Sequence, residues 1–242
     1  MRILIVRHGD PDYDIDGLTE KGKREVQLLA DRLVREDMTY IYCSPLGRAQ
    51  RTIEPTLERL GRKMEIVEWL HEFDRERIKV PYLDYTKPAW DLLPAFMAEH
   101  PDLYSPTEWR NVDFIKASKV GAYYDEICTE LDALLARHGY ERDGVIYRAV
   151  KPSHDTIVLV CHYGVTAVLL SHLFNCSPYS FWQQAVTLPT SVTTIYTEER
   201  EEGIASFRCC GIGDISHLYA GGEPAAFAAR FCECFTDDTR HH

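Results

Sequence analysis

Short apolar runs alternate with amphipathic stretches along most of the chain. Strands rich in β-branched residues are predicted at 3–6, 39–43, 64–67 and 156–161. Apolar residues recur at helical spacing over 19–36, 44–61, 119–138 and 165–174. The strand runs lack strict alternation, which is typical of strands buried on both faces. Strands that alternate with helices predict an α/β fold, a three-layer α/β/α sandwich around a mostly parallel sheet.

Local signals mark several element ends. Thr19 is predicted to cap the helix 19–36, and Ser44 to cap the next one, with Pro45 at its first position. A hairpin is predicted from strands 192–196 and 204–209, an edge strand at 145–147, and a helical tail over 223–235.

Residues 74–118 break the alternating pattern. They contain five prolines and many aromatic residues, with eight acidic and six basic side chains. We interpret this segment as a mostly helical and looped lid insertion within a single domain that spans 1–242.

Composition limits the classes of partner. The 242 residues carry a net charge of −11, which disfavours nucleic acid and anionic membranes as partners. No stretch approaches the roughly 18 apolar residues of a membrane span. The eight cysteines include no C-x-x-C pair, which favours reduced thiols, a cytoplasmic location and no metal.

Charged residues follow two predicted strands. Arg7-His8-Gly9 comes directly after strand 3–6, and His162-Tyr163-Gly164 directly after strand 156–161. Ligands bind at the carboxyl ends of parallel strands. Histidine can act as a nucleophile, and arginine is a fork-shaped donor for phosphate, so the pattern predicts phosphoryl transfer with His8 as nucleophile.

Two further side chains complete a candidate site. Arg48 falls in the first turn of a predicted helix, where a cation opposes the helix dipole, so a bound anion is expected beside it. Glu72 lies among apolar and aromatic neighbours that can raise the pKa of its carboxyl, as a proton donor requires. Asp10 is a second candidate acid.

These residues resemble the histidine phosphatase superfamily, in the branch named after cofactor-dependent phosphoglycerate mutase. The resemblance covers about residues 2–196 and rests on Arg7-His8-Gly9, Leu18-Thr19-x-x-Gly22, Ser44-Pro45-Leu46-x-Arg48-Ala49, Leu70-x-Glu72 and His162. It implies a phosphohistidine intermediate on His8, with no metal and no cofactor. Glu72 would be the general acid, and the phosphate would be held by Arg7, Arg48 and His162, with Gly9, Tyr163 and Gly164 beside it.

The chain also departs from that family. Asp14 stands where many relatives have a phosphate-binding asparagine, and Tyr163 replaces the first glycine after the second histidine. An aromatic insertion with nearly balanced charge suits hydrolysis of an ester with an apolar or ring-containing part.

The leading hypothesis is a metal-independent phosphomonoesterase that acts on a small phosphorylated metabolite. The alternatives are a phosphoglycerate-type mutase and a non-catalytic module that binds a phosphorylated ligand. A zinc site formed by His8, His162 and Asp10 is a fourth hypothesis. The oligomeric state is open, with a homodimer as one alternative.

Overall fold

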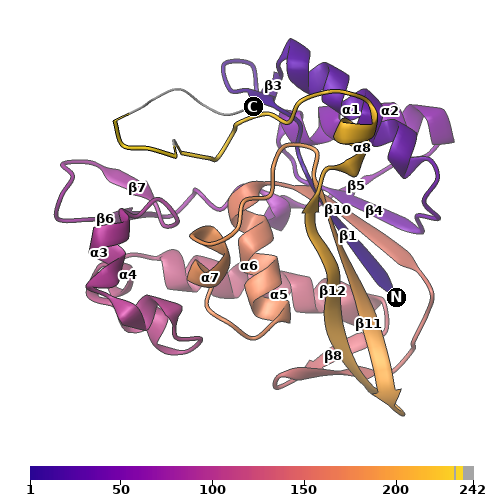
Figure 1. The fold of residues 1–242 in the computed structure, drawn as a ribbon. Coiled ribbons are helices and arrows are strands. Elements are labelled where there is room, and N and C mark those ends of the chain that lie inside the picture. The colour runs from indigo at the N-terminus through magenta and orange to yellow at the C-terminus, as the bar shows by residue number, and fades with distance from the viewer. Residues whose placement is uncertain (232, 237–242) are drawn as a thin grey trace.

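The chain folds around an eight-stranded sheet (Figure 1), seen in a computed structural model that describes residues 1–231 and 233–236. The strand order is β5-β4-β10-β1-β11-β12-β9-β8. The strands are β1 (Arg2–Arg7), β4 (Tyr40–Cys43), β5 (Glu65–Ile66), β8 (Tyr140–Asp143), β9 (Ile146–Ala149), β10 (Thr156–Cys161), β11 (Val192–Glu201) and β12 (Ile204–Asp214).

The four strands β5, β4, β10 and β1 are parallel and carry the candidate site. The other four strands are antiparallel to their neighbours. Arg7 at the end of β1 pairs in register with Cys161 at the end of β10. His8 and His162 therefore leave the sheet from adjacent strands at the same edge.

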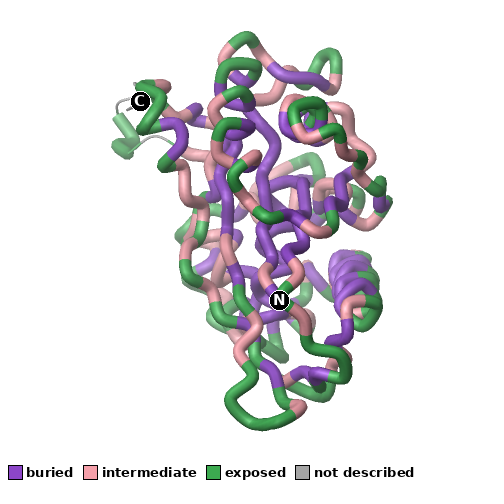
Figure 2. Tube along the Cα trace, turned by 90° about the vertical axis from the view of Figure 1, so that its right-hand side faces the viewer, coloured by how far each residue is buried: buried purple, intermediate pink, exposed green. Residues whose placement is uncertain are grey.

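Helices cover both faces of the sheet. Alternate side chains of β1 enter two separate hydrophobic clusters: Ile3 and Ile5 pack on the side of α5 (Val120–Arg137) and α6 (Tyr163–Leu173). Leu4 and Val6 pack on the side of α1 (Glu20–Leu33) and α2 (Gly47–Leu60). Figure 2 shows this burial as a central band along the strands. The predicted α/β fold with a three-layer arrangement is confirmed.

The insertion 74–118 packs on the same core as α5 and α6, through buried side chains such as Trp109 and Leu103. It follows a short helix at Glu68–Leu70 and holds one hairpin that the sequence did not predict. Its elements are β6 (Arg77–Lys79), β7 (Thr86–Pro88), α3 (Pro94–Ala98), the 3₁₀ turns Pro101–Tyr104 and Glu108–Asn111, and α4 (Asp113–Lys116).

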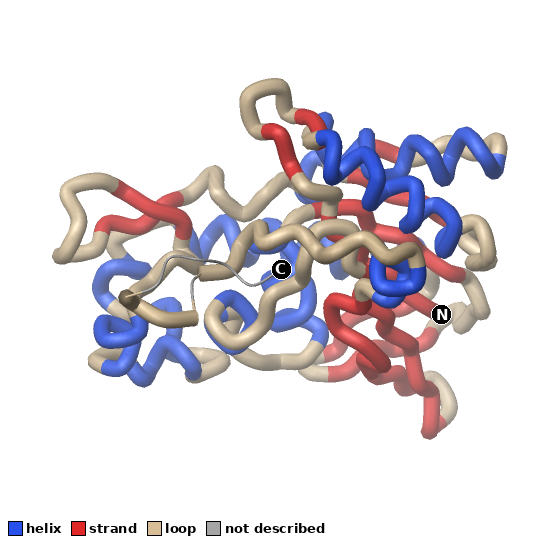
Figure 3. The backbone as a smooth tube through the Cα atoms, turned by 45° about the horizontal axis from the view of Figure 1, so that its top comes forward, coloured by secondary structure: helices blue, strands red, loops and turns tan. Residues whose placement is uncertain are grey.

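One predicted helix cap and one predicted helix are wrong. Helix α2 begins at Gly47 with Leu46 in extended backbone as its N-cap, so Ser44 does not cap it. The described residues of the tail, 223–231 and 233–235, contain no helix. The last helix of the described residues is α8 (Ser216–Ala220). Instead of forming a helix, the tail runs from α8 towards the insertion (Figures 1 and 3), and Lys21 and Arg24 of helix α1 bind Glu223 at its start.

Smaller differences concern turns and strand ends. A two-stranded hairpin, β2 (Pro11–Asp12) and β3 (Gly17–Leu18), follows β1. The predicted edge strand 145–147 is part of a hairpin of β8 and β9, and α7 (Tyr179–Trp182) follows α6. Within the described ranges, no helix combines the length and the apolarity needed to cross a bilayer.

Candidate active site

His8 lies immediately after β1 and is 1% exposed. Its Nδ1 lies 2.8 Å from the carbonyl oxygen of Gly9. Because a carbonyl only accepts, this contact places the proton on Nδ1 and leaves Nε2 with a free lone pair. Burial, together with the charges of Arg7 and Arg48, holds the pKa of His8 well below its ordinary value. The ring is therefore neutral and suited to nucleophilic attack through Nε2.

Gly9 fixes the turn after His8. Its N–H donates to Thr52 Oγ1 at 2.9 Å, and Thr52 in turn donates to the carbonyl of Arg48 at 2.7 Å. A Cβ at Gly9 would lie 3.0 Å from Val26 Cγ1, so only glycine fits without movement. Both backbone groups of Gly9 are thus engaged inside the protein, and its expected contact with phosphate stays a prediction.

His162 lies beside His8, with the two ring centroids 5.0 Å apart. Its Nε2 lies 2.7 Å from the Ser44 hydroxyl, which accepts from the Leu46 N–H at 3.2 Å. That arrangement lets Ser44 donate to Nε2 and leaves the proton of His162 on Nδ1. Burial and the nearby His8 hold the pKa of His162 well below its ordinary value. Ser44 is therefore a partner of His162 rather than a helix cap.

The two arginines are held by protein groups on one side only. Arg7 Nη1 donates to the carbonyl of Thr187 at 2.6 Å and to that of Ala228, in the tail, at 3.3 Å. Arg48 Nη1 pairs with Asp16 Oδ1 at 2.6 Å. Both guanidinium groups are close enough to lower the pKa of both histidines. The four predicted residues are thus brought together.

Three buried donors at this place have no acceptor. In the described part of the chain, the buried side-chain nitrogens that lack a hydrogen-bond partner are Arg7 Nε, Arg48 Nε and His162 Nδ1. An unsatisfied buried donor costs free energy, and functional sites are where such groups persist. An anion that accepts from all three would satisfy them. The arrangement is therefore suited to binding an anion such as phosphate beside His8.

Glu72 approaches the same site from the loop after β5. Its Oε1 accepts from the N–H of Phe73 at 2.7 Å and from that of Val165, in α6, at 3.2 Å. Burial raises the pKa of Glu72 despite these bonds and despite the nearby Arg7. Because Oε1 is occupied by two N–H groups, Oε2 is the oxygen free to carry a proton.

Gly164 makes the approach of Glu72 feasible. A Cβ there would lie 2.7 Å from Glu72 Oε1 and 2.5 Å from Trp90 Cζ3, closer than real Cβ contacts come. Trp90 comes from the insertion, and its ring packs edge to face against Tyr163 at 6.1 Å between centroids. The partly exposed Trp90 ring therefore stands next to the candidate acid.

Tyr163 is turned away from the anion position. Its hydroxyl donates to the carbonyls of Trp182 and Ala185, at 2.5 and 3.3 Å, and burial raises its pKa to about 12. Its ring lies 5.7 Å from the guanidinium of Arg7. Tyr163 thus supports Arg7, and a direct contact of its hydroxyl with phosphate is not what the geometry offers.

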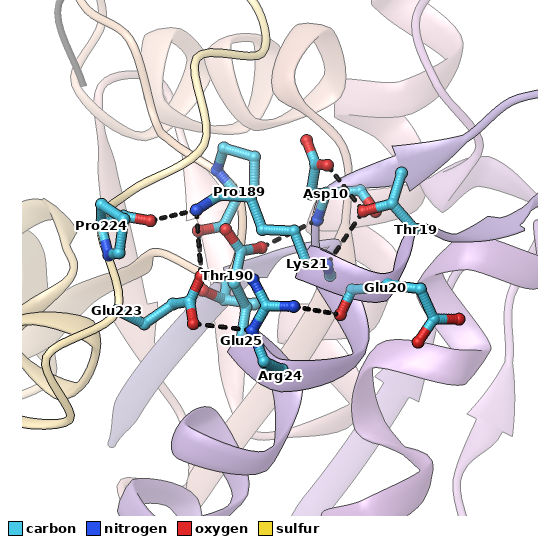
Figure 4. Close-up of polar contacts among 11 residues, drawn as sticks. Asp10, Thr19, Glu20, Lys21, Arg24, Glu25, Pro189, Thr190, Glu223 and Pro224 are labelled. Carbon is cyan, nitrogen blue, oxygen red and sulfur yellow. Dashed lines mark hydrogen bonds and ion pairs between the residues drawn. The ribbon is translucent and has the colours of Figure 1, made fainter.

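Asp10, the alternative acid, is used elsewhere (Figure 4). Its carboxylate accepts from the Thr19 hydroxyl at 2.7 Å, and its N–H donates to the buried Glu25 at 2.9 Å. Asp14 is exposed. The described residues bring together no group of three His, Cys, Asp or Glu side chains able to hold a metal ion. The zinc site of His8, His162 and Asp10 therefore has no support.

Sequence reasoning missed three residues of this site. Asp16 pairs with Arg48, Ser44 bonds to His162, and Trp90 lies beside Glu72. Asp16 is one of several acids in 10–16, and no local pattern distinguishes it. The Ser44-Pro45 pair is a common helix start, which hid the role of Ser44.

Comparison with known proteins agrees with this geometry. Residues 3–111 match the sequence profile of the histidine phosphatase superfamily, branch 1. A probable phosphatase of Schizosaccharomyces pombe is 27% identical over 236 residues, which cover 90% of this chain and 95% of that protein. Phosphoserine phosphatase 1 of Hydrogenobacter thermophilus is 22% identical over 226 residues, 88% of this chain and 95% of that one.

A solved structure has the same fold. It is a phosphoserine phosphatase variant of Entamoeba histolytica in complex with phosphoserine. The TM-score is 0.60 with 15% sequence identity, and the match covers 90% of this chain and 98% of the other.

Proposed function

We propose that this protein is a phosphomonoesterase that works through a phosphohistidine intermediate on His8. The observation that carries the proposal is the set of three unpartnered buried donors, on Arg7, Arg48 and His162, around a neutral imidazole. The match of residues 3–111 to the histidine phosphatase superfamily profile and the phosphatases among the relatives support the same reaction class.

In the first step, His8 Nε2 attacks phosphorus and the bond from phosphorus to the ester oxygen breaks. Arg7 and Arg48 would neutralise the negative charge on the phosphoryl oxygens, and the Nδ1–H of the neutral His162 would donate a hydrogen bond to one of them. Glu72 Oε2 gives its proton to the leaving alcohol, because the raised pKa of its carboxyl favours the protonated form.

In the second step, water attacks phosphorus and the bond from nitrogen to phosphorus breaks. The Glu72 carboxylate now takes a proton from that water, and His8 is regenerated as inorganic phosphate forms. Because the same carboxyl acts as acid and then as base, its protonation state is restored at the end of each cycle.

The insertion favours hydrolysis over mutase chemistry. A mutase must grip a second anionic group, yet four of the six basic side chains in 74–118 already contact protein acceptors: Arg75, Arg77, Lys87 and Arg110 bind Glu68, Thr86, Asp91 and Asp125, respectively. A leaving group with an apolar or ring-containing part fits better, and the partly exposed Trp90, next to Glu72, is the side chain that would contact it. The substrate is then a small phosphorylated metabolite of that kind.

A non-catalytic module that binds a phosphorylated ligand is the alternative of a different class. Pure binding would use Arg7, Arg48 and His162 but has no need of Glu72 at a raised pKa. A cytoplasmic location and a homodimer are further expectations, to be measured by fractionation and by light scattering.

The test is phosphate release from a varied panel of phosphoesters by wild type and His8→Ala, with EDTA present. We expect robust release by the wild type and loss of at least about a thousandfold in the variant. Turnover by His8→Ala at the wild-type rate would refute the mechanism. Ligand-induced stabilisation without release would favour the binding module, and conversion of phosphoglycerate isomers with a bisphosphate primer would favour the mutase.

A further inference from the structure

The turn of the β2–β3 hairpin, residues 13–16, holds Arg48 from two sides. Asp16 Oδ1 accepts from Arg48 Nη1 at 2.6 Å, and the Tyr13 ring lies 5.4 Å from the guanidinium carbon. The Arg48 side chain is 10% exposed and that of Asp16 is 42% exposed. The contact is therefore partly shielded from water, which strengthens it relative to an open surface pair.

Asp16 also serves as the missing cap of α2. That helix has Leu46 as its N-cap, with no side-chain cap bond of its own. Asp16 Oδ2 accepts from the Gly47 N–H at 2.6 Å, so a carboxylate stands at the positive end of the helix dipole. The sequence predicts an anion beside Arg48, because a cation in the first turn opposes the helix dipole. The Asp16 carboxylate is one such anion, and it comes from the chain itself.

Two backbone features accompany the contact between Asp16 and the start of α2. Asp16 has a φ of +46°, in the left-handed region that costs free energy for a residue other than glycine. A Cβ at Gly47 would lie 2.4 Å from the Asp16 carbonyl oxygen, so a glycine is needed opposite it. Two unusual features therefore meet at one contact.

The contact occupies one edge of the guanidinium and leaves the other for ligand. Asp16 takes Nη1, whereas Nε of Arg48 is buried without an acceptor. We propose that Asp16 is a positioning residue that holds Arg48 in the orientation in which its Nε edge binds the phosphoryl group. The proposal rests on the proposed function for its relevance to turnover, but its claim about phosphate binding does not.

Binding of inorganic phosphate, measured by isothermal titration calorimetry, tests this role without turnover. We expect Asp16→Ala to weaken phosphate binding about tenfold, because Arg48 loses its charged partner and its fixed orientation. Gly47→Ala, which displaces Asp16 sterically, should weaken binding in the same direction. Asp31→Ala is the matched control, because it removes the aspartate partner of another arginine of α2: Asp31 of α1 pairs with Arg59 at 2.5 Å. Phosphate binding by this variant should stay within about twofold of wild type.

A double-mutant cycle separates positioning from a general effect on the fold. In an Arg48→Ala background, Asp16→Ala should cause little further loss, because the residue through which it acts is absent. An equal loss in both backgrounds, or tighter phosphate binding by Asp16→Ala, would overturn the proposal; the latter would make Asp16 a competitor of phosphate. If Asp16→Ala unfolds, Asp16→Asn replaces it with the same expected direction.

The result is independent of the reaction assigned to the site. Phosphate binding with the expected cycle, but no release from any ester, would refute the phosphomonoesterase and leave the role of Asp16 intact. If the wild type hydrolyses esters while Asp16→Ala binds phosphate as tightly as the wild type does, the role of Asp16 is refuted and the phosphomonoesterase stands.

Discussion

Replacing Gly164 by alanine tests whether the acid and the start of α6 are packed as closely as the geometry requires. The new Cβ would lie 2.5 Å from Trp90 Cζ3 and 2.7 Å from Glu72 Oε1. Both groups would have to move, and Glu72 would lose part of its bond from the Val165 N–H, now 3.2 Å long. The perturbation therefore acts on the position of the Glu72 carboxyl, the proposed proton donor.

Two opposing effects set the stability change. Alanine in place of glycine within a helix stabilises by about 1 kcal/mol. Forcing a methyl group into a packed site costs roughly 1–3 kcal/mol. The net loss is about 0–2 kcal/mol, which for a chain of this size lowers the Tm by no more than roughly 8 °C. The variant should therefore fold.

Activity should fall much further than stability. Misplacement of a catalytic group by about 1 Å can cost on the order of a hundredfold in rate. We expect kcat/KM for alkyl phosphates, whose leaving oxygen needs the proton, to fall about ten- to hundredfold, and that for aryl phosphates to fall less. The assay is steady-state phosphate release with matched aryl and alkyl esters.

Gly121→Ala is the matched control. Gly121 is also the second residue of its helix, α5, and the nearest atom to its Cβ position is Arg110 Cγ at 4.0 Å. This variant gains helix propensity without a clash, so its Tm should stay level or rise and its activity should not change. A Gly164→Ala protein with wild-type kcat/KM for alkyl esters would refute the close packing of Glu72 on α6.

Three more predictions follow from the same site. Glu72→Gln should slow the hydrolysis of alkyl phosphates far more than that of aryl phosphates. It should also remove the basic limb of the pH profile of kcat/KM, because Glu72 acts while protonated and its raised pKa moves the loss of that proton to higher pH. Equal losses for both esters would exclude Glu72 as the acid. Trp90→Ala should raise KM about tenfold for esters with a ring-containing leaving group and hardly at all for methyl phosphate, in kinetics with the two substrates, and Trp90→Phe should retain most of the affinity. The Tm should fall as the pH is lowered below about 6.5, because His8 and His162 resist protonation in the folded state but accept protons when unfolded. In thermal melts, the Tm of His8→Asn should fall less steeply with pH than that of the wild type. The same dependence of Tm on pH in both proteins would contradict the claim that burial keeps His8 neutral.

Helices and strands with strong local patterns were predicted well. The apolar run before Arg7-His8-Gly9 is β1, and the run before His162 is β10. Thr19 caps α1 as predicted, since its Oγ1 accepts from the Gly22 N–H at 3.0 Å. Each of these features is decided within a few residues of chain, which is why a single sequence is enough.

The errors lie where distant contacts override local preference. Ser44 has the sequence context of a helix cap, yet its hydroxyl binds a histidine 118 residues away. The tail 223–235 is predicted to be helical, yet its described residues contain no helix, and Glu223 accepts from Lys21 at 3.1 Å and from Arg24 at 2.9 Å (Figure 4). Tertiary hydrogen bonds and ion pairs here decide what propensity alone leaves nearly balanced.

The sequence by itself determined the α/β class and placed the two histidines at the ends of two strands. It also selected Arg7, Arg48 and Glu72 as their partners. Only the tertiary structure decided which edge of each guanidinium remains free, which nitrogen of each histidine carries the proton, and that Asp16 rather than its acidic neighbours holds Arg48, 32 residues away. Chain patterns encode local backbone bonding and burial, whereas these choices arise when side chains from separate elements compete for the same few hydrogen bonds.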